Sequence, residues 1–103
     1  MSDSPAAFPP PEEGLSLHLR HCASEADATA DICQAYLSPL LVSLAVKFPN
    51  IDVHARESAA HDAIVHYLKK PSAYDPGRGD LAKYLRMAAR ADLLNHLRAE
   101  QRH

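Results

Sequence analysis

The chain has 103 residues, the size of one small domain, which excludes a cofactor domain joined to a separate substrate domain. With 47% apolar residues, 23% charged residues and three glycines, its composition is that of a globular protein and not of a collagen-like, disulfide-stapled or fully disordered chain. Alanine and leucine, which favour helices, supply most of the apolar positions, and β-branched residues are scarce. The composition predicts an all-α fold without a sheet.

The formal net charge of −2 is unevenly distributed along the chain. Residues 1–62 hold three basic and nine acidic residues, a net charge of −6, whereas residues 63–103 hold eight basic and four acidic residues, a net charge of +4. This asymmetry is typical of a protein with one surface for a phosphate backbone and another for a protein partner. The alternative is that the asymmetry has no function: charged faces that only keep the protein in solution could have the same uneven distribution of acidic and basic residues by chance.

The sequence predicts a cytoplasmic protein that does not enter a membrane. The first thirteen residues contain no basic residue and no apolar run, so they do not form a secretory signal. The longest apolar candidate, Leu40–Val46, has seven residues including Ser43, far from the ~20 that a membrane span requires. We therefore expect Cys22 and Cys33 to remain reduced.

Proline density predicts where the folded part begins. Four of the eight prolines lie within the first eleven residues, and two glutamates and a glycine follow. Proline removes backbone donors and this segment has little to bury, so we expect residues 1–14 to form a disordered tail. The domain over residues 15–103 is expected to contain a short helix at 15–22 and three principal helices in a small bundle.

The first principal helix is predicted from a capping box and an apolar stripe. Ser24, followed three residues later by Asp27, resembles a capping box with aspartate in place of glutamate. Apolar residues then recur at three- and four-residue spacing as far as Lys47. Pro39 lies inside this stripe, and because the stripe resumes beyond it, we expect a bend and not a stop.

Two further helices are predicted at residues 53–69 and 81–98. Asp52 and Asp80 each precede a helical apolar pattern and can cap it. Asp92 falls near the apolar stripe of the last helix, and the sequence offers no reason for an acid there.

A loop rich in proline and glycine, residues 71–79, leads into a segment with a recognisable pattern. Residues 75–98, DPGRGDLAKYLRMAARADLLNHLR, resemble region 2 of bacterial sigma factors of the sigma-70 family, particularly the extracytoplasmic-function type. In that family an acidic-Pro-x-Arg-Gly loop precedes a helix of pattern L-x-x-W-L-x-x-I-A-R-N. Residues 61–68, HDAIVHYL, resemble the family's Q-[ED]-[VA]-F-L-[RK]-L-W segment, and residues 36–41 resemble its opening helix. The resemblance covers about residues 25–102.

The resemblance implies a helical module of transcription initiation. One helix would dock on the coiled-coil of the largest subunit of core RNA polymerase, and the loop with the last helix would recognise and help open the −10 element of promoter DNA. Carried over by position, the polymerase-facing candidates are Glu57, His61 and Asp62. The DNA-binding candidates are Tyr74, Arg78, Lys83, Tyr84, Arg86, Arg90 and Asn95.

Opening a duplex requires a surface that favours single strands. An aromatic loop residue can accept an unstacked base while basic residues hold phosphates, and Tyr74 beside Arg78 supplies both. Structural alternatives remain for these candidates. Tyr74 could plug the end of the bundle with its hydroxyl in water, Arg86 and Arg90 could be solvated surface, and Asp62 could be an ordinary polar-face residue.

Departures from the family pattern keep a second function open. Ser58 stands where the family usually has an acid, and Ala91 replaces an asparagine able to read a base edge. The second helical domain of sigma factors, which reads the −35 element, has no counterpart in these 103 residues. The alternative is a sigma-like interaction module that binds an anti-sigma factor or regulator without DNA. A helical domain unrelated to sigma factors would also fit the composition.

No enzymatic or metal-binding motif is found. His18 and Cys22 are four residues apart with His21 nearby, but the further cysteine that would close a zinc motif is missing. Phosphate-binding, metalloprotease and serine-hydrolase motifs are absent from the sequence. We expect no catalytic activity, cofactor or bound metal.

Overall fold

The structure is a computed structural model that describes residues 7–101. These residues form four α-helices, α1 (Pro11–Cys22), α2 (Ala28–Lys47), α3 (Val53–Lys69) and α4 (Leu81–Gln101). Two short 3₁₀ helices, η1 (Pro71–Ala73) and η2 (Pro76–Arg78), lie between α3 and α4, and the described residues contain no strand. The all-α prediction is confirmed. The structure has more helices than the three principal ones predicted: α1, expected only as a short helix at 15–22, spans Pro11–Cys22 and packs against the others, and η1 and η2 were not predicted.

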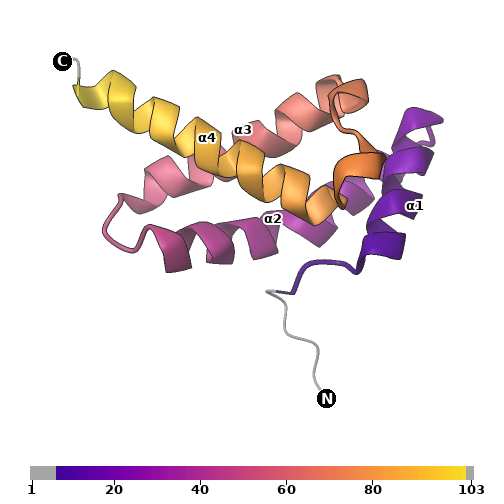
Figure 1. Ribbon diagram of the computed structural model, residues 1–103, viewed down its shortest axis with the longest axis horizontal. Helices are drawn as coiled ribbons and strands as arrows, with labels where there is room; N and C mark the ends of the chain where they lie inside the picture. Colours follow the sequence, from indigo (N-terminus) through magenta and orange to yellow (C-terminus); the bar gives the residue numbers. More distant parts are fainter. Residues whose placement is uncertain (1–6, 102–103) are drawn as a thin grey trace.

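Helices α2, α3 and α4 run along the length of the molecule, and α1 lies across one end (Figure 1). Each helix turns one face inward, and the core between them is built mainly from leucine, alanine and tyrosine. The largest fully buried side chains are Tyr36, Tyr67, Ile32, Leu40, Leu81, Leu85 and Leu93.

Helix α1 corrects the predicted tail over residues 1–14. It begins at Pro11, because proline is tolerated in the first turn of a helix, where its missing N–H would have no partner. Gly14 packs so closely on α2 that a Cβ there would lie 2.6 Å from Tyr36 Oη. Phe8, before the helix, also contacts Tyr36, with ring centroids 6.3 Å apart. The tail prediction is therefore wrong for residues 11–14, while residues 1–6 lie outside the described residues.

The turn between α1 and α2 differs from the predicted capping box. Ser24 has φ of 60°, the left-handed conformation that often ends a helix. The N–H of Ser24 donates to the carbonyl of His21, and the N–H of Glu25 to that of Arg20, the two bonds of a Schellman motif. Ser24 therefore ends α1 and does not begin α2. Asp27 is the N-cap residue of α2, without a side-chain capping bond.

Helix α2 continues through Pro39, as the apolar stripe predicted. With 20 residues, it is long and apolar enough to cross a membrane by length and composition alone. The expectation that no segment approaches this length is therefore wrong. The core helix of a bundle passes the same test, and here Ile32, Tyr36, Leu40 and Leu44 are buried in the core of this fold.

The predicted caps of α3 and α4 are confirmed. The carboxylate of Asp52 accepts from the N–H of Ala55 at 3.3 Å, and that of Asp80 from the N–H of Lys83 at 3.0 Å. Helix α3 has its predicted bounds, and α4 extends three residues past its predicted end. The guanidinium of Arg56 donates to the carbonyl oxygens of Phe48 and Ile51, which fixes the turn between α2 and α3.

Candidate nucleic-acid interface

The loop between α3 and α4 is held by its own hydrogen bonds. The hydroxyl of Tyr74 donates to the carbonyl oxygen of Gly79 at 2.9 Å, and the carboxylate of Asp75 accepts from the N–H of Gly77 at 2.9 Å. Gly79 has φ of +154°, a backbone conformation that is strained for any residue with a side chain and that glycine adopts freely. The loop therefore presents a defined shape at the start of α4.

Tyr74 lies in the core and not on the surface of this loop. Its side chain is 5% exposed, and burial, with smaller effects of Asp80 and Asp75, raises the pKa of its hydroxyl. Tyr74 is therefore not freely exposed to an unstacked base in this structure, and its role in DNA binding stays a prediction. The alternative that it plugs the end of the bundle fits better, although its hydroxyl bonds to Gly79.

Three tyrosines form a cluster beneath the loop, defined as Tyr67 of α3, Tyr74 of the loop and Tyr84 of α4. The ring centroids of Tyr74 and Tyr84 are 5.2 Å apart, and Tyr67 lies 6.3 Å and 6.2 Å from them. A cavity of about 360 Å³, here called the loop pocket, opens beside this cluster. Its lining includes Tyr74, Asp75, Arg78, Lys83, Tyr84 and Met87.

A second depression, here called the basic groove, lies between the end of α2 and the middle of α4. It has a volume of about 420 Å³ and includes Lys47 and Phe48 together with Lys83, Arg86 and Arg90. The three α4 cations fall on one face because they are spaced by three, four and seven residues. Within the described part of the chain, the groove lining carries no acidic side chain.

Lys47 is the member of this groove that sequence reasoning missed. It is the last residue of α2 and lies 36 positions before Lys83 in the chain, so no local pattern links the two. In the sequence, Lys47 is only a basic residue at the C-terminus of a predicted helix. A favourable interaction with the helix dipole is enough to explain a basic residue there, so nothing in the sequence connects it with DNA. Folding brings it to Arg86 and Arg90.

The loop pocket and the basic groove share Lys83 and Met87, so they form one continuous surface. From Lys83 to Arg90 the helix rises about 10 Å. A single strand could place a base in the pocket and its backbone along the groove.

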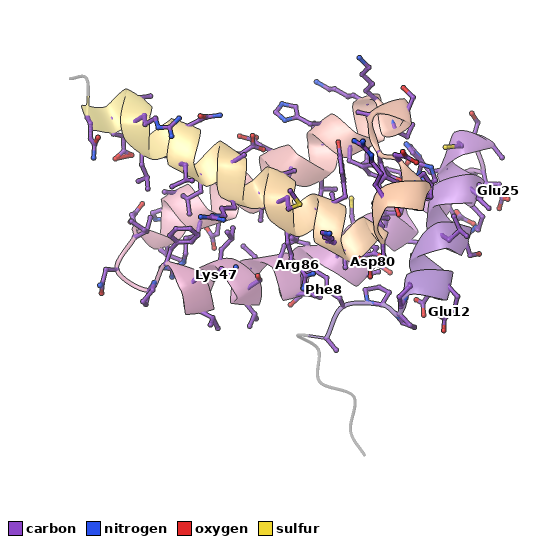
Figure 2. All side chains as sticks on the ribbon, in the orientation of Figure 1. Phe8, Glu12, Glu25, Lys47, Asp80 and Arg86 are labelled. Carbon is purple, nitrogen blue, oxygen red and sulfur yellow. The ribbon has the colours of Figure 1, made fainter. Side chains whose placement is uncertain are left out.

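Arg86 also contacts the segment that precedes α1. Its guanidinium carbon lies 5.3 Å from the centroid of the Phe8 ring, within cation–π range. Figure 2 shows the two side chains next to each other. Phe8 therefore contacts Arg86 without lining the basic groove itself.

Not all predicted DNA-binding residues belong to this surface. Arg78 is exposed at the loop pocket and lies 4.0 Å from Asp75, a weak exposed pair. Asn95 is exposed but does not line the groove. It lies five residues beyond Arg90, about 140° further around the helix. The structure thus gathers Tyr74, Arg78, Lys83, Tyr84, Arg86 and Arg90 around the pocket and groove and leaves Asn95 apart.

The polymerase-facing candidates lie together on the outer face of α3. Glu57, His61 and Asp62 are all exposed, because the residues that α3 buries lie on its opposite side. His54 Nδ1 lies 3.6 Å from the carboxylate of Glu57 on the same face. None of these residues lines the loop pocket or the basic groove.

Asp92 lies where α4 contacts α3. Its Oδ2 is buried and has no hydrogen-bond partner among residues 7–101, although His66 Nδ1 lies 3.7 Å away. Desolvation raises the pKa of this carboxyl, His66 opposes the rise, and the charge of Asp62 adds to it. Asp92, whose position the sequence did not explain, is therefore a partly buried carboxylate at the interface between α3 and α4, with one oxygen that lacks a hydrogen-bond partner among residues 7–101.

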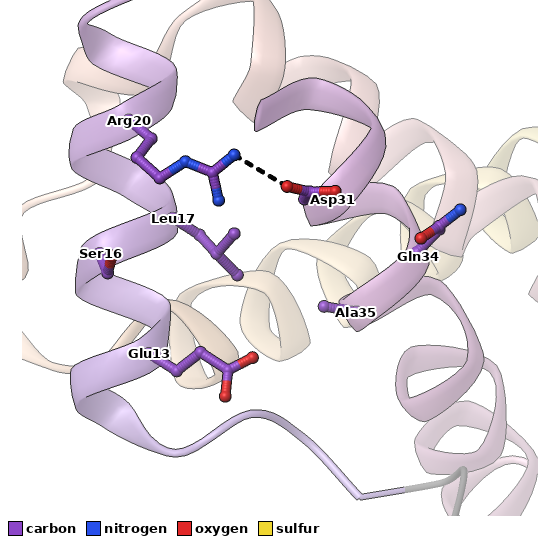
Figure 3. Close-up of a pocket in the computed structure, with 7 residues that line it drawn as sticks. All are labelled: Glu13, Ser16, Leu17, Arg20, Asp31, Gln34 and Ala35. Atoms are coloured by element: carbon purple, nitrogen blue, oxygen red, sulfur yellow. Dashed lines mark hydrogen bonds and ion pairs between the residues drawn. The ribbon is translucent and has the colours of Figure 1, made fainter. Parts of the chain in front are cut away.

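A third cavity, of about 410 Å³, lies between α1 and α2 (Figure 3). Arg20 donates to the carboxylate of Asp31 at 2.8 Å across it, and Glu13 and Gln34 also line it. No sequence pattern predicted this cavity. Among residues 7–101, no group of three or more His, Cys, Asp or Glu side chains is placed to hold a metal ion.

The fold and its surfaces define a helical module with a cationic groove next to an aromatic pocket. The family model for sigma-70 region 2 matches residues 33–103, and the chain therefore belongs to this family of sigma-factor domains. The match confirms the resemblance to region 2 of the sigma-70 family that was inferred from the sequence. Helix α1 and the first residues of α2 precede the matched segment. No curated protein and no solved structure matches the chain.

Proposed function

We propose that the chain is a transcription-initiation module, of the extracytoplasmic-function type, that binds core RNA polymerase and recognises and melts the promoter −10 element in the cytoplasm. The continuity of the loop pocket with the basic groove carries this proposal. It acts by binding alone, without catalysis or a cofactor.

The DNA-binding surface combines two interactions that favour single strands. The loop pocket, with Tyr84 and Met87 on its lining, accepts an unstacked base, since every base has a face that packs on aromatic side chains. Arg86, Arg90 and Lys47 hold the adjoining phosphates. Because a duplex cannot offer an unstacked base, the surface discriminates against it and stabilises the opened strand.

The polymerase-binding surface is the outer face of α3 with Glu57, His61 and Asp62. These side chains are exposed and separate from the pocket and groove, so polymerase and DNA can be bound at the same time. This division agrees with the charge asymmetry between the two parts of the sequence.

The second candidate is an interaction module that binds an anti-sigma factor without DNA. Ala91, exposed on α4 where the family has asparagine, favours it, because the chain offers no amide there to read a base edge. The two candidates differ in their partners: only the first requires binding to core RNA polymerase and the cations of the basic groove for DNA.

The DNA part is tested by measuring the affinity for a −10-type single strand and for the matching duplex at several salt concentrations. We expect the single strand to bind more tightly. Arg86→Ala, Arg90→Ala and Lys47→Ala should each lower the salt slope by about 0.7, the value for one phosphate contact on a single strand. Lys69→Ala, an exposed lysine of α3 outside the groove, is the matched control and should leave the slope unchanged.

The base pocket is tested by Tyr84→Ala. Loss of stacking should cost about 1–3 kcal/mol of binding free energy, with the salt slope unchanged, because stacking releases no counterions. Equal losses from the tyrosine, groove and control variants, with no change in slope, would show that all act through folding. That result would favour the interaction module.

The polymerase part is tested by Asp62→Lys. This charge reversal should weaken binding to core RNA polymerase and change the free energy of unfolding by no more than about 0.5 kcal/mol, since the side chain is exposed. A large loss of stability would mean that Asp62 is a structural residue and that the docking face lies elsewhere.

A further inference from the structure

We propose that His18, on α1 and outside the residues matched to sigma-70 region 2, is a positioning residue that sets the tyrosine wall of the loop pocket. The inference rests on the proposed function, because it makes base binding depend on a helix that precedes the matched segment.

His18 is buried in direct contact with the tyrosine cluster. Its side chain is 6% exposed, and its Nδ1 shares a hydrogen bond of 2.7 Å with the hydroxyl of Tyr67. Its ring meets Tyr74 edge-on, with centroids 4.8 Å apart and an interplanar angle of 87°. This is a favourable geometry for two aromatic rings. His18 therefore fixes Tyr67 by a hydrogen bond and Tyr74 by ring packing.

A chain of ring contacts links His18, through Tyr74, to the loop pocket. Tyr74 packs on Tyr84 at 5.2 Å, and both rings line the pocket. The hydroxyl of Tyr74 also holds Gly79, the residue with the left-handed backbone. A shift of the Tyr74 ring would therefore change both the wall of the pocket and the loop at its mouth.

Other contacts hold α1 in place, so His18 is not needed merely to dock the helix. His21 Nε2 donates to the carbonyl oxygen of Leu68 at 2.9 Å, and Arg20 pairs with Asp31 at 2.8 Å. Leu17 is buried to the same extent as His18, in the core and on the lining of the α1–α2 cavity. Leu17 thus offers a matched control on the same helix.

The position also makes the pocket sensitive to pH. Burial, and secondarily the charge of His21, lowers the pKa of His18. The groups that face its ring are His21 and Cys22 on α1, Tyr67 on α3 and Tyr74 in the loop, and no carboxylate of residues 7–101 is among these contacts. A proton on His18 would place a charge among these rings. Because the pKa of His18 is lower in the folded state than the ordinary value of the imidazole, the contact is stable at neutral pH and is lost as the pH falls through this lowered pKa.

The test compares His18→Ala with Leu17→Ala in the full chain, first without DNA. The NMR signals of the Tyr74 ring should shift in His18→Ala and stay unchanged in Leu17→Ala. With a −10-type single strand carrying 2-aminopurine, His18→Ala should bind about 2- to 10-fold more weakly, the loss expected for one aromatic pair, with less quenching of the probe and the same salt slope. Leu17→Ala should bind as the wild type does.

Two further variants keep the inference testable if His18→Ala does not fold, and one of them also measures the pH dependence. Tyr67→Phe removes only the hydrogen bond to His18 and should also shift the Tyr74 signals. His18→Phe restores a ring that cannot be protonated, so its binding should not weaken as the pH falls below neutral, whereas wild-type binding should weaken as the pH falls through the lowered pKa of His18.

Unchanged Tyr74 signals in His18→Ala and Tyr67→Phe, or equal loss of DNA affinity in His18→Ala and Leu17→Ala, would overturn the inference. If the wild type binds no −10-type strand at any salt concentration, the proposed function is overturned instead. The Tyr74 signals then decide alone whether His18 positions the ring.

Discussion

Replacing Asp92 with alanine removes a carboxylate from the interface between α3 and α4. The buried Oδ2 of this residue has no hydrogen-bond partner among residues 7–101, and such an atom costs about 1–3 kcal/mol. Alanine is also favoured over aspartate inside a helix by about 0.5–0.7 kcal/mol. The lost pair with His66 opposes these gains by about 0.2–1 kcal/mol, because the imidazole is mostly exposed. We expect Asp92→Ala to raise the free energy of unfolding by about 0.5–3.5 kcal/mol.

The gain should depend on pH in a defined direction. Burial raises the pKa of the Asp92 carboxyl in the folded state, so the folded protein binds its proton more tightly than the unfolded chain does. The wild type therefore loses stability as the pH rises through this pKa, and Asp92→Ala does not. The advantage of the variant should be largest at neutral pH and should shrink as the pH falls towards 4.

Thermal unfolding followed by circular dichroism measures this effect. A gain of 1 kcal/mol corresponds to a rise in Tm of about 4–8 °C for a domain of this size. Glu57→Ala, an exposed acid on α3 that does not act on Asp92, is the control and should change the free energy of unfolding by less than about 0.5 kcal/mol. A lower Tm for Asp92→Ala than for the wild type at pH 7 would refute the reasoning, because it would show that the carboxylate stabilises the interface.

Three further predictions concern α1 and the loop, each measured by denaturant unfolding. Gly14→Ala should lower the free energy of unfolding by about 1–3 kcal/mol, because its Cβ would lie 2.6 Å from the buried hydroxyl of Tyr36; no effect would mean that α1 is not packed there. Ser24→Gly should raise it by about 0.5–1 kcal/mol, since glycine adopts the left-handed conformation without strain; a decrease would contradict the assigned turn. Tyr74→Phe should lower it by about 1 kcal/mol through loss of the bond to Gly79, and an unchanged value would show that this bond is not formed.

Features encoded by neighbouring residues could be predicted from the sequence. The bounds of α3 follow from Asp52 and from an apolar stripe of helical period, and both act within a few residues. The start of α4 follows in the same way from Asp80. The family followed from the loop and the first turns of α4, which lie next to each other in the chain.

Features that depend on contacts between distant segments could not be predicted. Proline density near the N-terminus is typical of a tail, and only the packing of Gly14 on Tyr36 shows that the helix begins at Pro11. The sequence left open whether Tyr74 accepts a base or plugs the end of the bundle, and only the folded structure shows that rings of α1, α3 and α4 enclose it. Lys47 joins the basic groove only once α2 packs beside α4.

The central claim is that one chain holds polymerase and the opened −10 strand at the same time. The most direct measurement is the retention of a labelled −10-type single strand by immobilised core RNA polymerase, with and without this protein. We predict that the strand is retained only when the protein is present, that Asp62→Lys abolishes retention of both protein and strand, and that Arg86→Ala combined with Arg90→Ala abolishes retention of the strand alone. Failure of the wild-type protein to bind core RNA polymerase, together with tight binding to an anti-sigma factor, would contradict the claim.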